Sequence, residues 1–231
     1  MTKELFKDDS YLNECDAVIE KLSENSVTLN QTIFYAEGGG QLGDTGYLII
    51  NDEEYRVSNT IRENNKIKHI LDTTLGLTEK MSVKCKIDWD RRYKLMKTHS
   101  CLHILCSVVD APVTGGSVGE GKGRLDFDIE EKPNKLLLTK TLQEIINQNY
   151  KIKSSWITEK YLNENPKLVK TMSVSPPMGS GEIRMIKIGD NIDFQPCGGT
   201  HVKNSSEIGE IEVSKVENKG KRNKRVIVNI R

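Results

Sequence analysis

The sequence has few histidines, no long apolar run and no excess of charge of either sign. Four histidines occur in 231 residues, and the formal net charge is +1. The apolar runs, such as Tyr47–Ile50 and Leu136–Leu138, are far too short to cross a bilayer. The first ten residues, MTKELFKDDS, contain no apolar segment of the kind found in secretory signals. We therefore expect a cytoplasmic protein that has no membrane partner.

The cysteines do not form a disulfide framework. Their number is odd and their spacing is irregular, at Cys15, Cys85, Cys101, Cys106 and Cys197. We expect most of them to be buried thiols. Cys197 is the exception, because it belongs to a motif described below.

The near-neutral charge neither proves nor excludes a nucleic-acid partner, because such footprints are local. Basic residues do gather in one place, at Lys219, Lys221, Arg222, Lys224 and Arg225. Two interpretations remain open, a solvated hairpin turn and a loop that contacts phosphates.

Residues 1–88 predict a small β-barrel-like domain. Short runs with β-branched or alternating character are separated by Gly, Asn and Asp. Closure into a barrel would remove exposed strand edges. The expected strands are Val27–Leu29, Tyr47–Ile50, Tyr55–Val57, Ile67–Leu71 and Met81–Ile87.

Residues 89–231 mix helices and strands without regular alternation, which predicts an α+β arrangement of two layers. We expect a helix over 90–109, capped by Asp88 or Asp90, and a second helix opened by Pro133 and Asn134. A shorter helix is expected over 155–163, followed by a loop at 175–181. The expected strands are 124–129, 183–188, 208–216 and 226–230.

Three of the four histidines lie in two short motifs. His99 and His103 are four residues apart in the first expected helix, so their rings share one helix face. Cys197 and His201 enclose two glycines, which let the backbone turn tightly enough for both side chains to face inward. One thiolate and three imidazoles favour zinc over iron or cobalt.

Either motif alone is weak evidence for a metal. Their joint appearance in a chain so poor in histidine favours one shared site. Four protein ligands close a tetrahedral shell, and closed zinc sites are usually structural, whereas catalysis needs an open position. His201 is then either a ligand that yields or a general base beside a three-ligand ion, and both roles remain open.

A glycine-rich segment, FYAEGGGQLGDTG, spans residues 34–46. One interpretation is a tight hairpin between Ile33 and Tyr47. The other is a loop whose bare backbone amides and Gln41 side chain contact RNA.

Together, the THSCLH segment at 98–103, the CGGTH segment at 197–201 and the FYAEGGGQ segment resemble the editing half of alanyl-tRNA synthetase. The chain is most similar to the free-standing AlaX-type alanyl-tRNA editing proteins. The resemblance covers about residues 33–211. It implies an editing-domain fold over 89–231 of the type that threonyl- and alanyl-tRNA synthetases share. Because 231 residues leave no room for an aminoacylation module, it also implies action in trans.

The resemblance implies the following site. His99, His103, Cys197 and His201 are the expected catalytic residues and zinc ligands. Gly39, Gly40 and Gln41 form the family's glycine-rich loop, and Thr114 and Ser117 resemble the stretch that lines the amino-acid pocket. The expected substrate is tRNA for alanine mischarged with serine, or with glycine, and the expected partner is tRNA rather than DNA.

Three alternatives remain open at this point. One is a zinc hydrolase of a small-molecule ester, which would turn over without tRNA. Another is the editing domain of a threonyl-tRNA synthetase. The last is an RNA-binding module with structural zinc, which predicts tight, salt-sensitive tRNA binding without ester cleavage.

Overall fold

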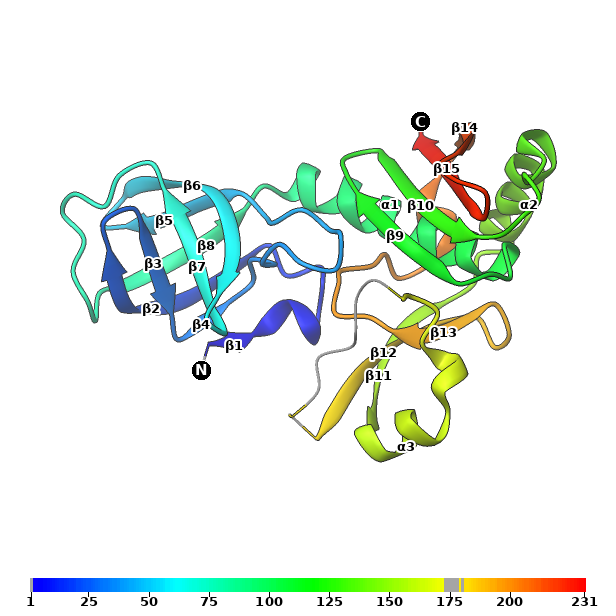
Figure 1. The fold of residues 1–231 in the computed structure, drawn as a ribbon. Helices are drawn as coiled ribbons and strands as arrows, with labels where there is room; N and C mark the ends of the chain where they lie inside the picture. The colour runs from blue at the N-terminus through cyan, green and yellow to red at the C-terminus, as the bar shows by residue number, and fades with distance from the viewer. Residues whose placement is uncertain (1, 173–178, 180) are drawn as a thin grey trace. The chain divides into compact units, whose positions relative to one another are not determined.

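The computed structural model describes residues 2–172, 179 and 181–231. The chain divides into two compact units, residues up to Tyr93 and residues from Lys94 onward (Figure 1). A domain boundary after residue 88, at the start of helix α1 (Trp89–Val108), stays a proposal. None of the helices in the described ranges is long and apolar enough to cross a membrane.

The first unit is a closed six-stranded barrel with the strand order β2-β3-β7-β6-β5-β8. Buried and exposed residues alternate along its strands, as on Ser82–Ile87, so one side of each strand fills the core. A short parallel pair, β1 (Lys3–Glu4) and β4 (Gln31–Thr32), lies outside the barrel. The barrel strands are β2 (Glu14–Ser23), β3 (Ser26–Leu29), β5 (Gly46–Ile50), β6 (Glu53–Glu63), β7 (Lys66–Leu71) and β8 (Ser82–Ile87).

A buried ion pair fixes the glycine-rich segment in this unit. Arg92 forms an ion pair with Asp44, and both side chains are almost fully buried. Arg92 also donates to the carbonyl oxygens of Ile33 and Ser10. Asp44 accepts the backbone N–H of Tyr35 at 2.6 Å. Both charges therefore have several partners, which a buried pair requires.

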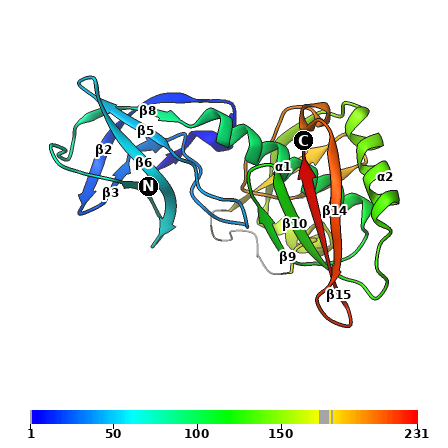
Figure 2. The same cartoon turned by 90° about the horizontal axis from the view of Figure 1, so that it is seen from above.

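In the second unit, a four-stranded sheet with the order β14-β15-β10-β9 carries two helices (Figure 2). Helix α1 packs on β10 at Gly123, where an added Cβ would lie 2.7 Å from Thr98 Cγ2. Helix α2 (Lys135–Asn147) covers the outer edge of β14, because Thr139 Oγ1 accepts from the backbone N–H of Val213. The strands are β9 (Val113–Val118), β10 (Lys122–Asp128), β14 (Ile211–Asn218) and β15 (Asn223–Ile230).

A three-stranded sheet completes this unit, with the order β11-β12-β13. Helix α3 (Glu159–Glu164) packs on it through Leu162, which is buried with Ile183 and Met185. The strands are β11 (Ile152–Thr158), β12 (Glu182–Ile188) and β13 (Asp193–Pro196). Short 3-10 helices follow three of these elements: η1 (Leu5–Lys7) follows β1, η2 (Pro166–Leu168) follows α3, and η3 (Ser205–Ile208) follows the loop that contains residues 197–201.

The predicted α+β class and N-terminal barrel are confirmed. So is the long helix, and Asp88 is the residue that caps it, accepting from Arg91 N at 3.2 Å. The expected helix over 155–163 is wrong in its first half: residues up to Thr158 pair with β12, and Thr158 then caps α3. The strand expected over 208–216 begins later than predicted, because Ile208 ends η3 and β14 starts at Ile211. The loop expected at 175–181 lies largely outside the described residues.

Candidate metal centre

Helix α1 presents two imidazoles from a buried turn. Residues 99–106 of this helix are all buried, so it is a core element with little amphipathic character. His99 and His103 are one turn apart, as their spacing predicts, and their ring centroids lie 5.1 Å apart. The helix thus offers two nitrogens from one rigid element.

The loop after β13 supplies the other two side chains. Arg184 of β12 shapes this loop, since its Nη1 donates to the carbonyl oxygens of Cys197 and Gly199, each at 2.9 Å. The backbone N–H of Cys197 donates back to Arg184 O at 3.0 Å. The backbone N–H of Gly199 points at Cys197 Sγ, 3.4 Å away. Arg184 is itself buried, so the loop is held by several contacts at once.

The four predicted side chains converge. Their ligand atoms all lie within 4.8 Å of one another, across about a hundred residues of chain. Cys197 Sγ lies 3.6 Å from His99 Nε2 and 3.3 Å from His201 Nε2. In a tetrahedral zinc site with ordinary Zn–S and Zn–N bonds, the S···N edge is about 3.6 Å. The donor set and its spacing therefore fit a zinc ion.

His103 has a carboxylate behind it. Its Nδ1 lies 2.8 Å from Asp193 Oδ2, and Asp193 also accepts from Lys170 Nζ and Gln195 Nε2, each at 2.8 Å. With Nδ1–H donated to the carboxylate, Nε2 is the nitrogen left to face the cluster. Metal-binding histidines in proteins commonly have such a carboxylate partner.

His201 has an equivalent partner. Ser100 Oγ lies 3.1 Å from His201 Nδ1 and accepts the backbone N–H of Val202 at 3.2 Å. The hydroxyl oxygen has a second lone pair that can accept the Nδ1–H of His201, and in that tautomer the lone pair of Nε2 faces Cys197. Ser100 lies inside the first motif. One turn of α1 therefore supplies His99 and His103 to the cluster and also the hydroxyl that supports His201.

The electrostatics favour the metal-binding form of the thiol. Burial opposes ionisation of Cys197, but interactions with the imidazoles around it, His99 first, outweigh burial and hold its pKa well below the ordinary value. Burial, followed by the charge of His99, lowers the pKa of His201 to about 3. Burial also lowers the pKa of His103, but the Cys197 thiolate and Asp193 outweigh it and raise that pKa to about 10. A metal would therefore meet a thiolate and displace a proton from His103.

The glycine-rich segment forms a tight turn in the first unit. Gly38 and Gln41 exchange backbone hydrogen bonds of 3.1 and 2.9 Å around Gly39 and Gly40, which both have positive φ. That geometry is the two-residue hairpin turn for which glycine is favoured. The glycines are exposed, whereas Gln41 is buried. Backbone groups of the glycines are therefore open to a ligand.

Thr114 and Ser117 lie on the edge strand β9, next to the strand that packs on α1. Both are partly exposed. Thr114 Oγ1 donates to Asp126 O at 3.2 Å, which leaves its oxygen able to accept. Their assignment to an amino-acid pocket stays a prediction.

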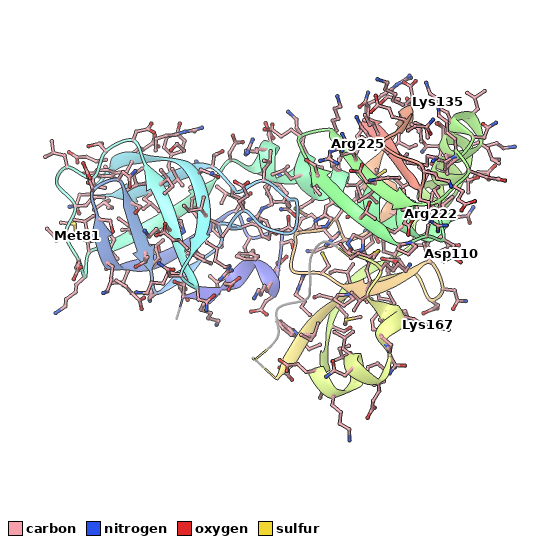
Figure 3. All side chains as sticks on the ribbon, viewed as in Figure 1. Met81, Asp110, Lys135, Lys167, Arg222 and Arg225 are labelled. Carbon is pink, nitrogen blue, oxygen red and sulfur yellow. The ribbon has the colours of Figure 1, made fainter. Side chains whose placement is uncertain are left out.

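The basic run forms the turn between β14 and β15 and the first residues of β15, where Figure 3 labels Arg222 and Arg225. Several of its charges are already paired. Arg222 pairs with Asp128 and Glu130, and Arg225 binds Asp126 through two nitrogens. Lys224 is buried and donates to two carbonyls of its own turn. These pairings favour the hairpin interpretation, and phosphate contact stays a prediction.

Sequence reasoning missed the residues behind the ligands, although a signal was present. Asp193, Gln195 and Cys197 are spaced by two along a strand and its exit, so alternation places them on one face. Lys170 and Arg184 carry no local signal, because only the folded chain brings Lys170 to Asp193 and Arg184 to the loop.

Two family models match the chain. The model described as "tRNA synthetases class II (A)" matches residues 3–91, and that of the "Threonyl and Alanyl tRNA synthetase second additional domain" matches residues 183–227. Among curated relatives, "Alanyl-tRNA editing protein AlaX-M" of Saccharolobus solfataricus is 36% identical, with all of both chains covered. The protein of the same name from Methanosarcina acetivorans is 33% identical, with 98% of both covered.

A longer relative places the match within a larger protein. An "Alanine--tRNA ligase" of Sulfurisphaera tokodaii is 36% identical over 94% of this chain, but over 25% of its own length. Two lines of evidence therefore agree: relatives above 30% identity match this chain over its whole length, and the side chains of the two motifs converge. The chain belongs to the family of alanyl-tRNA editing proteins.

Proposed function

We propose that this chain hydrolyses the ester bond of tRNA for alanine mischarged with serine, and that the cluster on α1 and the CGGTH loop is the active site. The observation that carries the proposal is the convergence of His99, His103, Cys197 and His201 in a chain of this family. Alanyl-tRNA editing is deacylation, so the partner is the charged tRNA and the reaction is hydrolysis.

The cluster is proposed to hold one zinc ion. Mixed nitrogen and sulfur donors of borderline softness suit zinc, and the Sγ···Nε2 separations match a tetrahedral edge. A bound zinc ion would supply a Lewis acid that polarises the attacking water or the ester carbonyl.

The residues around the cluster then have separable tasks. Asp193 orients His103, and Ser100 orients His201. His201 is neutral, because burial lowers its pKa to about 3, so its Nε2 lone pair can bind the metal. To act instead as a general base toward water, His201 would need a higher pKa in the substrate complex. These two uses of His201 are the ones that an open or a closed metal shell would require.

Discrimination is proposed to depend on the serine hydroxyl. A pocket built for alanine rejects an added hydroxyl poorly, whereas a pocket that hydrogen-bonds the hydroxyl rejects the amino acid that lacks it. Thr114 and Ser117 offer hydroxyls on β9, and Thr114 Oγ1 has acceptor capacity left. The exposed amides of Gly39 and Gly40, with Gln41 beside them, are proposed to contact the tRNA.

One observation favours a second candidate function. The three histidines of the cluster are buried, and four protein ligands would fill a tetrahedral shell. An RNA-binding module with structural zinc would look the same, and would bind tRNA without cleaving the ester.

The deciding experiment measures release of serine, glycine and alanine from the charged alanine tRNA. Wild type is compared with His103→Ala and Cys197→Ala, and Cys101→Ala is the control that removes a buried thiol whose pKa is shifted by burial alone. We expect release of serine well above release of alanine, and loss of release in the first two variants alone. Serine release undiminished in variants that are folded would refute the proposal, and tRNA binding without release would favour structural zinc.

A further inference from the structure

Two cysteines face each other across the seam that closes the barrel. Cys15 of β2 is the direct cross-strand partner of Cys85 of β8, and the pairing of these two strands joins the first barrel strand to the last. Both lie at inward positions. Cys85 is fully buried in the barrel core, and Cys15 packs against the same core while staying partly exposed.

The ladder fixes how far apart the two residues are. Two positions along, Ile87 N donates to Asn13 O at 3.0 Å. Because antiparallel pairs alternate, Cys15 and Cys85 are also a hydrogen-bonded pair, with Cα atoms about 5.5 Å apart. Disulfides span Cα separations of about 4.4 to 6.8 Å. No change of strand register is needed to join the two thiols.

The two thiols also differ in character. The hydrogen bond from Cys85 outweighs burial and lowers the pKa of Cys15, while that same hydrogen bond, together with burial, raises the pKa of Cys85 well above the ordinary value. A partly exposed thiol with a lowered pKa beside a buried one is the arrangement of an oxidant-sensing cysteine and its resolving partner.

We propose that Cys15 and Cys85 are an oxidative modification site, at which a peroxide converts the two thiols into a cross-strand disulfide that staples the barrel seam. The Cys15 thiolate attacks one peroxide oxygen, the O–O bond breaks, and Cys15 becomes a sulfenic acid as hydroxide leaves. The Cys85 thiol then attacks the Cys15 sulfur, the S–S bond forms, and water leaves. In total, two thiols lose two electrons and two protons, and one peroxide is reduced to two waters.

The chain contains its own controls. Burial raises the pKa of Cys101 and that of Cys106 to about 12, so neither thiol forms thiolate readily. Both thiols are therefore expected to react slowly with peroxide. Cys197 has thiolate character as well, so the protein is loaded with zinc before oxidation, and Cys197 is followed separately.

The test treats the zinc-loaded full chain with hydrogen peroxide, alkylates the remaining thiols and maps peptides by mass spectrometry. We expect a linked peptide pair that contains residues 15 and 85 and lacks two hydrogen atoms, reverted by dithiothreitol. The Cys15 thiol should disappear at least about tenfold faster than that of Cys101.

Variants decide the mechanism. Cys85→Ser should leave a sulfenic acid on Cys15 that dimedone labels, Cys15→Ser should abolish the link, and Cys101→Ala should leave it unchanged. If Cys85→Ser does not fold, the Cys15→Ser result and the wild-type peptide map still decide. Cys15 and Cys85 both recovered as alkylated thiols while other cysteines oxidise would overturn the proposal, and would show that the pair serves only as core packing.

Discussion

Asp193 accepts the Nδ1 hydrogen of His103 at 2.8 Å while it is itself buried and bound by Lys170. Burial of Asp193 opposes its ionisation, but His103 and Lys170 outweigh burial and hold its pKa below the ordinary value. A carboxylate is therefore maintained behind His103, where it fixes which imidazole nitrogen faces the other three side chains of the cluster.

Replacing this carboxylate should weaken metal binding while the fold persists. For Asp193→Asn we expect zinc affinity to fall about 10- to 100-fold, the usual effect of losing the partner of a ligating histidine. Competition with a chromophoric chelator measures it. Asp190→Asn is the matched control, because Asp190 is an exposed residue paired with Lys187 near the same sheet. Equal zinc affinity in wild type and Asp193→Asn would contradict the orienting role.

The buried ion pair of the first unit should be essential to its stability. Arg92→Met leaves the Asp44 carboxylate buried without its cation, and we expect the free energy of unfolding to fall by about 3–5 kcal/mol. Urea denaturation measures it. Arg62→Met, which removes an exposed pair with Glu4, should cost about 1 kcal/mol or less. Equal losses in the two variants would argue against a special role for the buried pair.

Acid should destabilise the barrel through His69. This imidazole is fully buried between Thr32 Oγ1 and Val27 O, and burial lowers its pKa from 6.5 to about 4. Because the unfolded chain binds the proton more readily, stability is fully present above pH 6.5 and is lost as the pH falls toward 4. At pH 4.5 the loss attributable to His69 is about 2–3 kcal/mol.

The comparison that isolates this effect is His69→Gln. Urea midpoints measured from pH 7.5 down to 4.5 should fall less steeply in the variant than in wild type, since the other titrating groups are shared. Parallel pH profiles in the two proteins would exclude the buried histidine as the cause.

The glycine-rich segment should tolerate substitution at one glycine and not at another. A Cβ on Gly43 would lie 2.2 Å from the carbonyl oxygen of Thr60, a backbone atom that cannot move aside cheaply. We expect Gly43→Ala to lower the free energy of unfolding by about 2 kcal/mol or more. Gly38→Ala meets nothing closer than 3.8 Å and should change it by less than about 0.5 kcal/mol. Thermal denaturation of the two variants tests the difference. Equal melting midpoints would contradict the prediction that only Gly43 is closely packed.

The sequence predicted those elements in which local pattern and tertiary role agree. Alternating apolar residues such as Val83 and Ile87 placed a barrel strand, and the spacing of His99 and His103 placed two rings on one face. Strand β2 was missed because Glu, Asp and Lys fill its outward positions and hide the short inward series. The 155–163 segment misled because only the pairing of β11 with β12 decides that Trp156 is in a strand.

The candidate site followed the same division. The convergence of His99, His103, Cys197 and His201 was predictable because a scarce residue type recurs in two compact motifs. The supports were not, since Lys170 and Arg184 act through contacts that the fold alone creates.

The most direct test of the metal centre is zinc X-ray absorption on the purified protein, with the metal content measured alongside. We expect one zinc per chain, bound by three nitrogens at about 2.0–2.1 Å and one sulfur at about 2.3 Å, or by two nitrogens, one sulfur and an oxygen if His201 yields. The sulfur should vanish in Cys197→Ala. A protein that binds no zinc, or a shell without sulfur, would contradict the account.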